Sequence, residues 1–291
     1  MKIFPNIVIN FHAIHDEKWL DNVLSILKQN YNIISIKELE QFFYEGKKLK
    51  NCCHITIDDG HKSFYEVFFP LLKKYQIPAS LFVSPMAIRE QKNFWFQEIK
   101  GYDEKVLLDI IKNDHAKTRN VGFDSTLKSY LKNMDVESIW GVINRYQEIT
   151  STPAKPCVNL TVDQLLELNN SDYVNIGAHT QTHPILSNES DEKSYKELKD
   201  SIYELGDLLN KPILYFAYPN GEPGTDFGER EINTLSQLDI KLAFSIEKKS
   251  FKKGDSPISI PRNGFSKGNR MYVLTKLALG KHWDSIKKLL K

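Results

Sequence analysis

Short apolar segments alternate with amphipathic helical patterns along most of the chain. A helical pattern at 19–29, for example, follows the apolar run Ile7–Phe11 and places leucines and a valine on one face. Strands separated by helices of this length pair in parallel, because the chain must cross back before the next strand begins. The order predicts an α/β fold, either an open doubly wound sheet or a barrel. About seven of these segments should form the sheet, and the candidates are 7–11, 33–35, 52–57, 80–83, 174–178, 213–217, 242–246 and 258–260.

The alternation stops between residues 85 and 159. This segment is rich in charged and aromatic residues and has helical patterns of its own, where a connection of a few residues would be usual. We therefore expect one domain over residues 1–291, with a mostly helical insertion at about 85–159. An insertion beside the carboxyl ends of parallel strands is placed to wall or cover a site.

Charge and hydropathy exclude several classes of protein. Basic and acidic residues nearly balance, with a formal charge of +2, and the lysines are spread along the chain, so no nucleic-acid footprint is expected. We find no apolar stretch long enough to span a bilayer and no signal-peptide pattern at the start, which favours a cytoplasmic protein. The cysteines, Cys52, Cys53 and Cys157, lack a metal or redox spacing and are expected to be buried thiols.

Two adjacent carboxylates, Asp58 and Asp59, directly follow the apolar run Cys52–Ile57. The carboxyl ends of parallel strands are where α/β folds place their active sites. Neighbouring side chains at a strand end point in different directions, so one can hold a metal while the other faces a substrate, and Gly60 permits a tight turn. Alternatively, the pair caps a helix or forms an ordinary turn.

A second polar group, His179 and His183, follows the apolar run Val174–Ala178. Imidazoles four residues apart suit a single metal ion if the segment makes a helical turn, although this spacing also arises by chance. Together with Asp59 they would form a two-histidine, one-carboxylate ligand set that leaves positions for water and substrate. A third strand end, 216–221, reads Phe-Ala-Tyr-Pro-Asn-Gly, and its turn could direct backbone N–H groups at one point.

The order of the three segments, T-I-D-D-G, G-A-H-T-Q-T-H-P and F-A-Y-P-N-G, resembles the polysaccharide deacetylase family from Ile7 to about Phe265, outside the insertion. The resemblance implies a distorted (β/α) barrel that removes acetyl groups from carbohydrates. It also implies Asp58 as the catalytic base and a divalent metal, usually zinc but also cobalt or nickel, on Asp59, His179 and His183.

The chain departs from the family pattern in two places. Ala217 stands where many members have an arginine that braces the base, and Arg262 is our candidate replacement, although it could equally be a structural arginine. The family's late histidine, its usual general acid, is not evident, and His282 in an expected terminal helix fits poorly. His12, at the end of the first strand, is the candidate acid, with a structural role beside the metal as the alternative.

The expected reaction is hydrolysis of an acetamide on a carbohydrate, such as an oligosaccharide or a surface-glycan precursor. Asp58 would take a proton from the attacking water, and the Asn220 backbone N–H would stabilise the oxyanion. Tyr218 and Trp95 are the candidate substrate contacts, although the tryptophan could instead pack the core of the insertion. Two alternatives remain open: a non-catalytic sugar- or metal-binding member of the same fold, and a hydrolase for another acyl group. The sequence does not indicate an oligomeric state.

Overall fold

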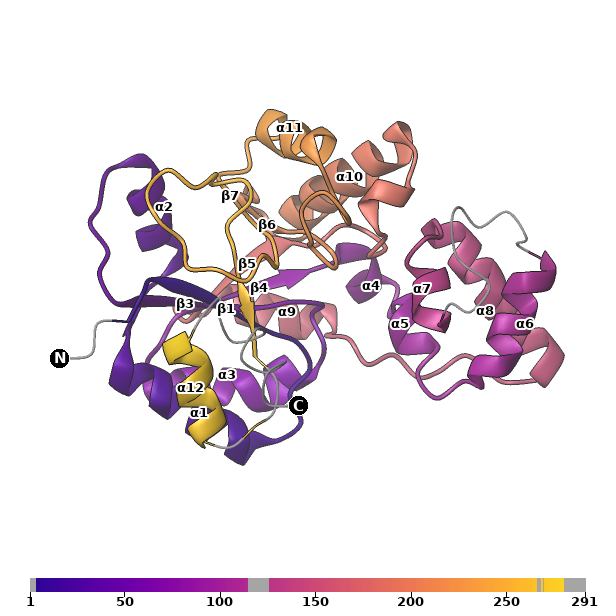
Figure 1. Cartoon of the computed structure of the whole chain (residues 1–291), viewed down its shortest axis with the longest axis horizontal. Coiled ribbons are helices and arrows are strands. Elements are labelled where there is room, and N and C mark those ends of the chain that lie inside the picture. The colour runs from indigo at the N-terminus through magenta and orange to yellow at the C-terminus, as the bar shows by residue number, and fades with distance from the viewer. Residues whose placement is uncertain (1–3, 115–125, 266–267, 269, 280–291) are drawn as a thin grey trace.

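The computed structural model describes residues 4–114, 126–265, 268 and 270–279, and within them a parallel sheet forms the centre of the molecule (Figure 1). Its strands run in the order β7-β6-β5-β4-β3-β1-β8, with β2 beside the start of β3, and every pairing is parallel. The bounds are β1 (Ile7–Phe11), β2 (Asn32–Ile33), β3 (Cys52–Ile57), β4 (Ala79–Val83), β5 (Val174–Ala178), β6 (Tyr215–Ala217), β7 (Leu242–Phe244) and β8 (Asn263–Gly264).

The two edges of the sheet approach each other through one segment near the C-terminus. Ile260 forms a parallel bridge with Phe244 of β7, and three residues later Asn263 pairs with Ile9 of β1. The expected distorted (β/α) barrel is therefore confirmed. The expected strand at 258–260 is wrong in position, because this segment contributes only a bridge and the strand forms at β8.

The helices pack on the outer face of the sheet, and polar caps fix where several of them begin. Asp16 accepts a hydrogen bond from the Trp19 backbone N–H at the start of α1, and Ser190 caps α10 in the same way. Their bounds are α1 (Glu17–Asn30), α2 (Ile36–Tyr44), the π-helical turn η1 (Phe64–Phe68), α3 (Phe69–Tyr75), α9 (Val162–Asn169), the 3₁₀ turn η2 (Leu186–Asn188), α10 (Asp191–Leu209), α11 (Glu229–Gln237) and α12 (Arg270–Leu279).

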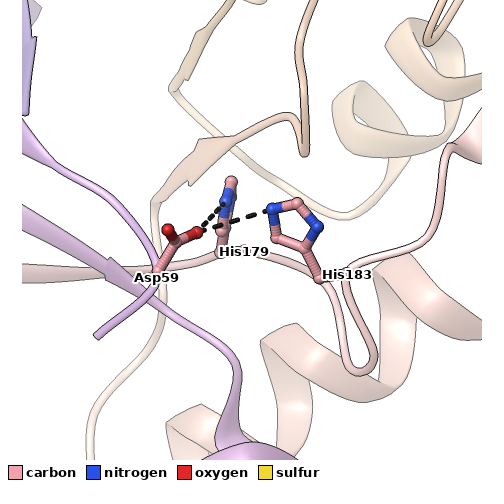
Figure 2. A group of neighbouring side chains, drawn as sticks. All are labelled: Asp59, His179 and His183. Atoms are coloured by element: carbon pink, nitrogen blue, oxygen red, sulfur yellow. Dashed lines mark ion pairs between the residues drawn. The ribbon is translucent and has the colours of Figure 1, made fainter. Parts of the chain in front are cut away.

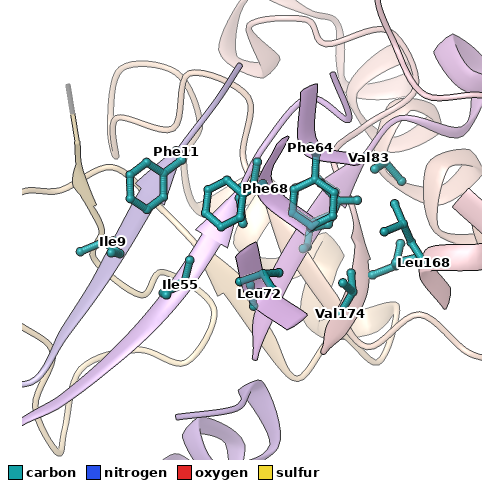
Figure 3. Close-up of a cluster of buried hydrophobic side chains, with 14 of the residues drawn as sticks. Ile9, Phe11, Ile55, Phe64, Phe68, Leu72, Val83, Leu168 and Val174 are labelled. Carbon is teal, nitrogen blue, oxygen red and sulfur yellow. The ribbon is translucent and has the colours of Figure 1, made fainter. Parts of the chain in front are cut away.

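Alternating side chains of the strands supply the core. Ile9 and Phe11 of β1 and Ile55 of β3 point toward the helices, where they meet Phe68 and Leu72 (Figure 3). The residues between them point to the inside of the barrel, and these include Asn10 and Thr56, both buried. The barrel interior therefore carries polar groups at the strand ends where the site is expected.

The insertion forms a helical lobe beside the barrel (Figure 1). Between β4 and α9 the described helices are α4 (Pro85–Arg89), α5 (Trp95–Glu98), α6 (Glu104–Asp114), α7 (Leu127–Leu131) and α8 (Val136–Thr150). The lobe has an apolar core of its own, which includes Leu107, Val142 and Ile143. Across the described residues, no helix combines the length and apolar character needed to cross a bilayer.

Candidate metal centre and active site

Two strand ends bring Asp59, His179 and His183 together (Figure 2). Asp59 follows β3, and both histidines lie in the loop that follows β5. One ligand atom from each residue lies within 4.8 Å of the others, and all three residues are buried. The Nε2 atoms of both histidines lie 3.5 Å from Asp59 Oδ1. This distance is too long for a good hydrogen bond and leaves space for an ion between the three side chains.

The donor set fits a divalent metal. Asp59 Oδ1 is buried and has no hydrogen-bond partner among the described residues, which is costly unless a cation occupies the site. His179 Nδ1 lies 2.7 Å from the carbonyl oxygen of Ala217, so this nitrogen carries the proton and Nε2 presents its lone pair toward Asp59. Two imidazole nitrogens and a carboxylate oxygen suit zinc and related ions.

The backbone of the ligand residues is unusual. Asp59 and His183 adopt positive φ angles of 74° and 58°, a left-handed conformation that non-glycine residues rarely take. Such strained residues persist where the surrounding structure enforces them, often at functional sites. Gly177, two residues before His179, is required for packing, because a Cβ there would lie 2.6 Å from both the Phe82 ring and the Tyr215 carbonyl oxygen.

A carboxylate from α10 holds the loop between the two histidines. Glu197 accepts hydrogen bonds from the backbone N–H groups of Gln181 and Thr182, both at 2.9 Å, and from the Thr182 hydroxyl at 2.6 Å. Thr180 Oγ1 also accepts from the His183 backbone N–H at 3.2 Å. Sequence reasoning missed Glu197, because an acidic residue on a charged helix looks like part of its solvent-exposed face.

Asp58 lies beside the ligand set and is held by Arg262. The guanidinium donates to both carboxylate oxygens at 2.8 Å, and Arg262 is completely buried. Arg262 is itself fixed by the carbonyl oxygen of Ser245 at 3.0 Å and the hydroxyl of Thr56 at 3.2 Å. The arginine expected to brace the base thus makes a bidentate contact with it from the segment that closes the barrel.

A further group at Asp58 is Asn10, which donates from Nδ2 to Asp58 Oδ2 at 3.1 Å. Sequence reasoning missed this residue too. The available signal was a polar residue inside the apolar run Ile7–Phe11, at a position whose side chain points into the barrel.

Opposing effects set the pKa values of both aspartates. Burial raises the pKa of Asp58, but the charge and hydrogen bonds of Arg262 outweigh it, so that the pKa lies below its usual value. Burial likewise raises the pKa of Asp59, and the nearby imidazoles of His179 and His183 outweigh it, holding the pKa well below the usual value. Both carboxylates are therefore ionised at neutral pH.

Asp58, Asp59, His179 and His183 line a cavity of about 900 Å³ between the barrel and the insertion. The barrel side includes His12, which is exposed, and Asn220, which has a positive φ of 56°. The insertion side includes Trp95, whose indole N–H donates to the carbonyl oxygen of His183 at 3.1 Å, and Phe96, whose ring centroid lies 4.8 Å from that of His183. The insertion is therefore one wall of the site.

Tyr218 also lines this cavity, although its side chain is buried. It is fully buried, its hydroxyl donates to the Ile258 carbonyl oxygen at 3.0 Å, and its ring stacks on Phe227 with centroids 3.6 Å apart. The expected contact between Tyr218 and substrate stays a prediction, and the packed ring leaves little of the side chain for such a contact. His282 lies outside the described residues.

Comparison with known proteins connects this geometry to a family. The family model for polysaccharide deacetylase matches residues 45–243, more than half of the chain. A poly-beta-1,6-N-acetyl-D-glucosamine N-deacetylase of Staphylococcus aureus is 20% identical over 280 residues, covering 88% of this chain and 77% of the relative. An enzyme of the same name from Staphylococcus epidermidis is 28% identical over 75 residues, 26% of each chain.

Solved structures share the fold. The Streptococcus pyogenes deacetylase PplD in complex with acetate has a TM-score of 0.64 and 18% identity, covering 95% of this chain and 99% of that one. IcaB from Ammonifex degensii has a TM-score of 0.64 and 17% identity, covering 94% of this chain and 96% of that one. The region matched by the family model contains Asp58, Asp59 and both histidines. The chain therefore belongs to the polysaccharide deacetylase family.

Proposed function

We propose that this chain is a zinc-dependent hydrolase that removes the acetyl group from an N-acetylated saccharide. The observation that carries the proposal is the meeting of Asp59, His179 and His183 beside an Asp58 carboxylate held by Arg262. The ligand set suits zinc, and it also accepts cobalt or nickel. The names of the staphylococcal relatives support an N-acetylglucosamine saccharide as the substrate.

A divalent metal on these three residues would supply Lewis acidity, polarising the acetyl carbonyl and lowering the pKa of a water molecule. Asp58 would accept the proton of the water as it attacks the carbonyl carbon. Arg262 fixes both oxygens of Asp58, so the carboxylate stays ionised and keeps one orientation. The Asn220 backbone N–H is our candidate for stabilising the developing oxyanion.

The amine that leaves must gain a proton. His12 lines the same cavity as Asp58 and Asp59 and is exposed at its rim, which would allow it to exchange protons with solvent. We assign it as the general acid. Trp95 supports a saccharide contact only through the face of its ring, because its N–H is already used by the His183 carbonyl oxygen.

We further propose that the enzyme acts in the cytoplasm on a surface-glycan precursor. The three cysteines, Cys52, Cys53 and Cys157, are free thiols, which supports a reducing compartment. Fractionation of cells that produce the tagged protein would test this, and recovery from the cell surface would overturn it.

Metal content and acid release test the reaction. Purified protein should carry near-stoichiometric metal and release acetate from N-acetylglucosamine oligosaccharides, whereas metal-loaded Asp58→Asn should retain the metal and lose turnover. Full turnover by Asp58→Asn would remove the base assignment. Release of formate or another acid in place of acetate would favour a hydrolase for a different acyl group. Stoichiometric metal without any acid release would favour the non-catalytic alternative.

A further inference from the structure

A buried hydrogen-bond acceptor in the catalytic cavity has no partner in the protein. Asn10 is 2% exposed and lines the same cavity as Asp58, Asp59 and the two histidines. Its Oδ1 atom has no hydrogen-bond partner among the described residues. Leaving a buried acceptor unpaired is unfavourable, so a group that pairs with it on binding gains the hydrogen bond and relieves that penalty.

The orientation of the Asn10 amide follows from its neighbour. Asp58 Oδ2 accepts from the Asn10 NH2 group at 3.1 Å, and both oxygens of the same carboxylate accept from Arg262, so the side of Asn10 that faces Asp58 is the donor side. The planar amide then directs Oδ1 away from Asp58. The strand register fixes the position of the side chain. Asn10 pairs with Thr56 of β3 and Gly264 of β8, and its side chain points into the barrel.

We propose that Asn10 is a specificity residue that recognises the N–H group of the substrate acetamide. This inference rests on the proposed function and deepens it. An N-acetyl group carries a donor on the nitrogen beside the carbonyl that Asp58 and the metal ligands surround. An O-acetyl ester has an oxygen there and cannot donate, so it would leave Asn10 Oδ1 unpaired. The geometry points to selection of amides over esters.

Asn220 supplies a matched control from the same cavity. Its Nδ2 atom is a buried donor with no partner among the described residues, the opposite of the Asn10 acceptor. A donor can bind the carbonyl oxygen or a sugar hydroxyl, and both amide and ester substrates have these groups. Asn220→Ala should therefore lower the rates on amide and ester by similar factors.

The test compares kcat/KM for an N-acetylglucosamine oligosaccharide and for an O-acetylated oligosaccharide of the same linkage. Because Asn10 also orients Asp58, Asn10→Ala should slow both reactions, but the ratio of amide to ester rates should fall about tenfold more than in Asn220→Ala. An unchanged ratio in Asn10→Ala would overturn the proposal and reduce Asn10 to a support for Asp58, while acetate release would still uphold the proposed function.

Calorimetry separates recognition from turnover. In the metal-loaded protein, Asn10→Ala should weaken binding of an N-methanesulfonyl-glucosamine oligosaccharide, which keeps the N–H group but has no acetyl group to hydrolyse, about tenfold. If the wild-type protein releases no acetate yet this loss of binding is observed, the proposed reaction fails and recognition by Asn10 stands. If Asn10→Ala leaves binding unchanged, recognition by Asn10 fails whatever the turnover.

Discussion

The barrel and the helical insertion contribute to one cavity in different ways. The barrel supplies Asp58 and the proposed metal ligands from its strand ends, and Asp58 is tied to Arg262 deep in its interior. The insertion has a separate apolar core and supplies a mixed wall, in which aromatic and aliphatic side chains lie beside Glu104, Lys128 and Lys132. The groups proposed for the chemistry therefore come from the barrel, whereas the insertion shapes the space for substrate.

The two histidine ligands show the same contrast at atomic scale. His179 is anchored by the barrel, through Nδ1 and the Ala217 carbonyl oxygen. His183 Nδ1 is buried without a hydrogen-bond partner among the described residues, and its ring lies against Phe94 and Phe96 of the insertion, with centroids 5.3 and 4.8 Å away. The ring of His179 is held by a hydrogen bond, and the ring of His183 by packing against the insertion.

The largest effect should come from removing a ligand that the barrel holds. We expect His179→Ala to lose near-stoichiometric metal and to lower kcat on the order of a thousandfold, because the carbonyl is no longer polarised. Elemental analysis and acetate release measure this. His15→Ala is the control, since His15 is exposed and contacts the His61 ring. Metal retained by His179→Ala at the wild-type level would contradict the assigned ligand set.

Breaking the ion pair between Arg262 and Asp58 by Arg262→Met should strongly destabilise the fold. It leaves Asp58 buried without its counter-charge, which costs about 3–5 kcal/mol in the free energy of unfolding. Arg145→Met in the insertion removes an exposed pair with Glu148 and should cost no more than about 0.5 kcal/mol. Denaturant unfolding of both variants measures the difference, and equal losses would show that the Arg262 pair is worth no more than a surface pair.

Acid should weaken the barrel before the insertion. His54 in β3 is fully buried, with its ring nitrogens 2.9 Å from the Ile34 carbonyl oxygen and 3.0 Å from the Ser80 hydroxyl, and burial lowers its pKa to about 4. A histidine whose pKa is depressed in the folded state stabilises the fold above its unfolded pKa, near 6.5, and loses this contribution as the pH falls toward 4. The free energy of unfolding should fall by roughly 3 kcal/mol as His54 becomes protonated.

Hydrogen exchange at pH 7 and pH 4.5 can locate that loss. Peptides from β3 should lose protection, whereas α8 should change less, because no histidine belongs to the insertion core among the described residues. His54→Gln, which retains polar groups at the site, should flatten the pH dependence in β3. Equal loss of protection in β3 and α8 would show that the two regions unfold as one unit.

Sequence alone located the barrel and its charged strand ends but not the contacts that complete the site. The strands Ile7–Phe11, Cys52–Ile57 and Val174–Ala178 were predicted with their observed bounds, because each is a short, mostly apolar run that is followed by polar residues. The two-residue strand β8 was missed, since its pairing depends on barrel closure and not on a local pattern. Asn10 was missed for a related reason, because its role depends on a neighbour 48 residues away.

The smallest expected effect tests whether the insertion holds a metal ligand. Trp95→Phe keeps an aromatic ring but removes the N–H that donates to the His183 carbonyl oxygen, so metal affinity should weaken roughly three- to tenfold. Trp140→Phe is the matched control, because Trp140 packs against the insertion core and does not line the cavity. Competition with a chromophoric chelator measures both affinities. A selective loss in Trp95→Phe would show that the insertion supports the metal site as well as walling it, whereas equal affinities would assign the metal site to the barrel alone.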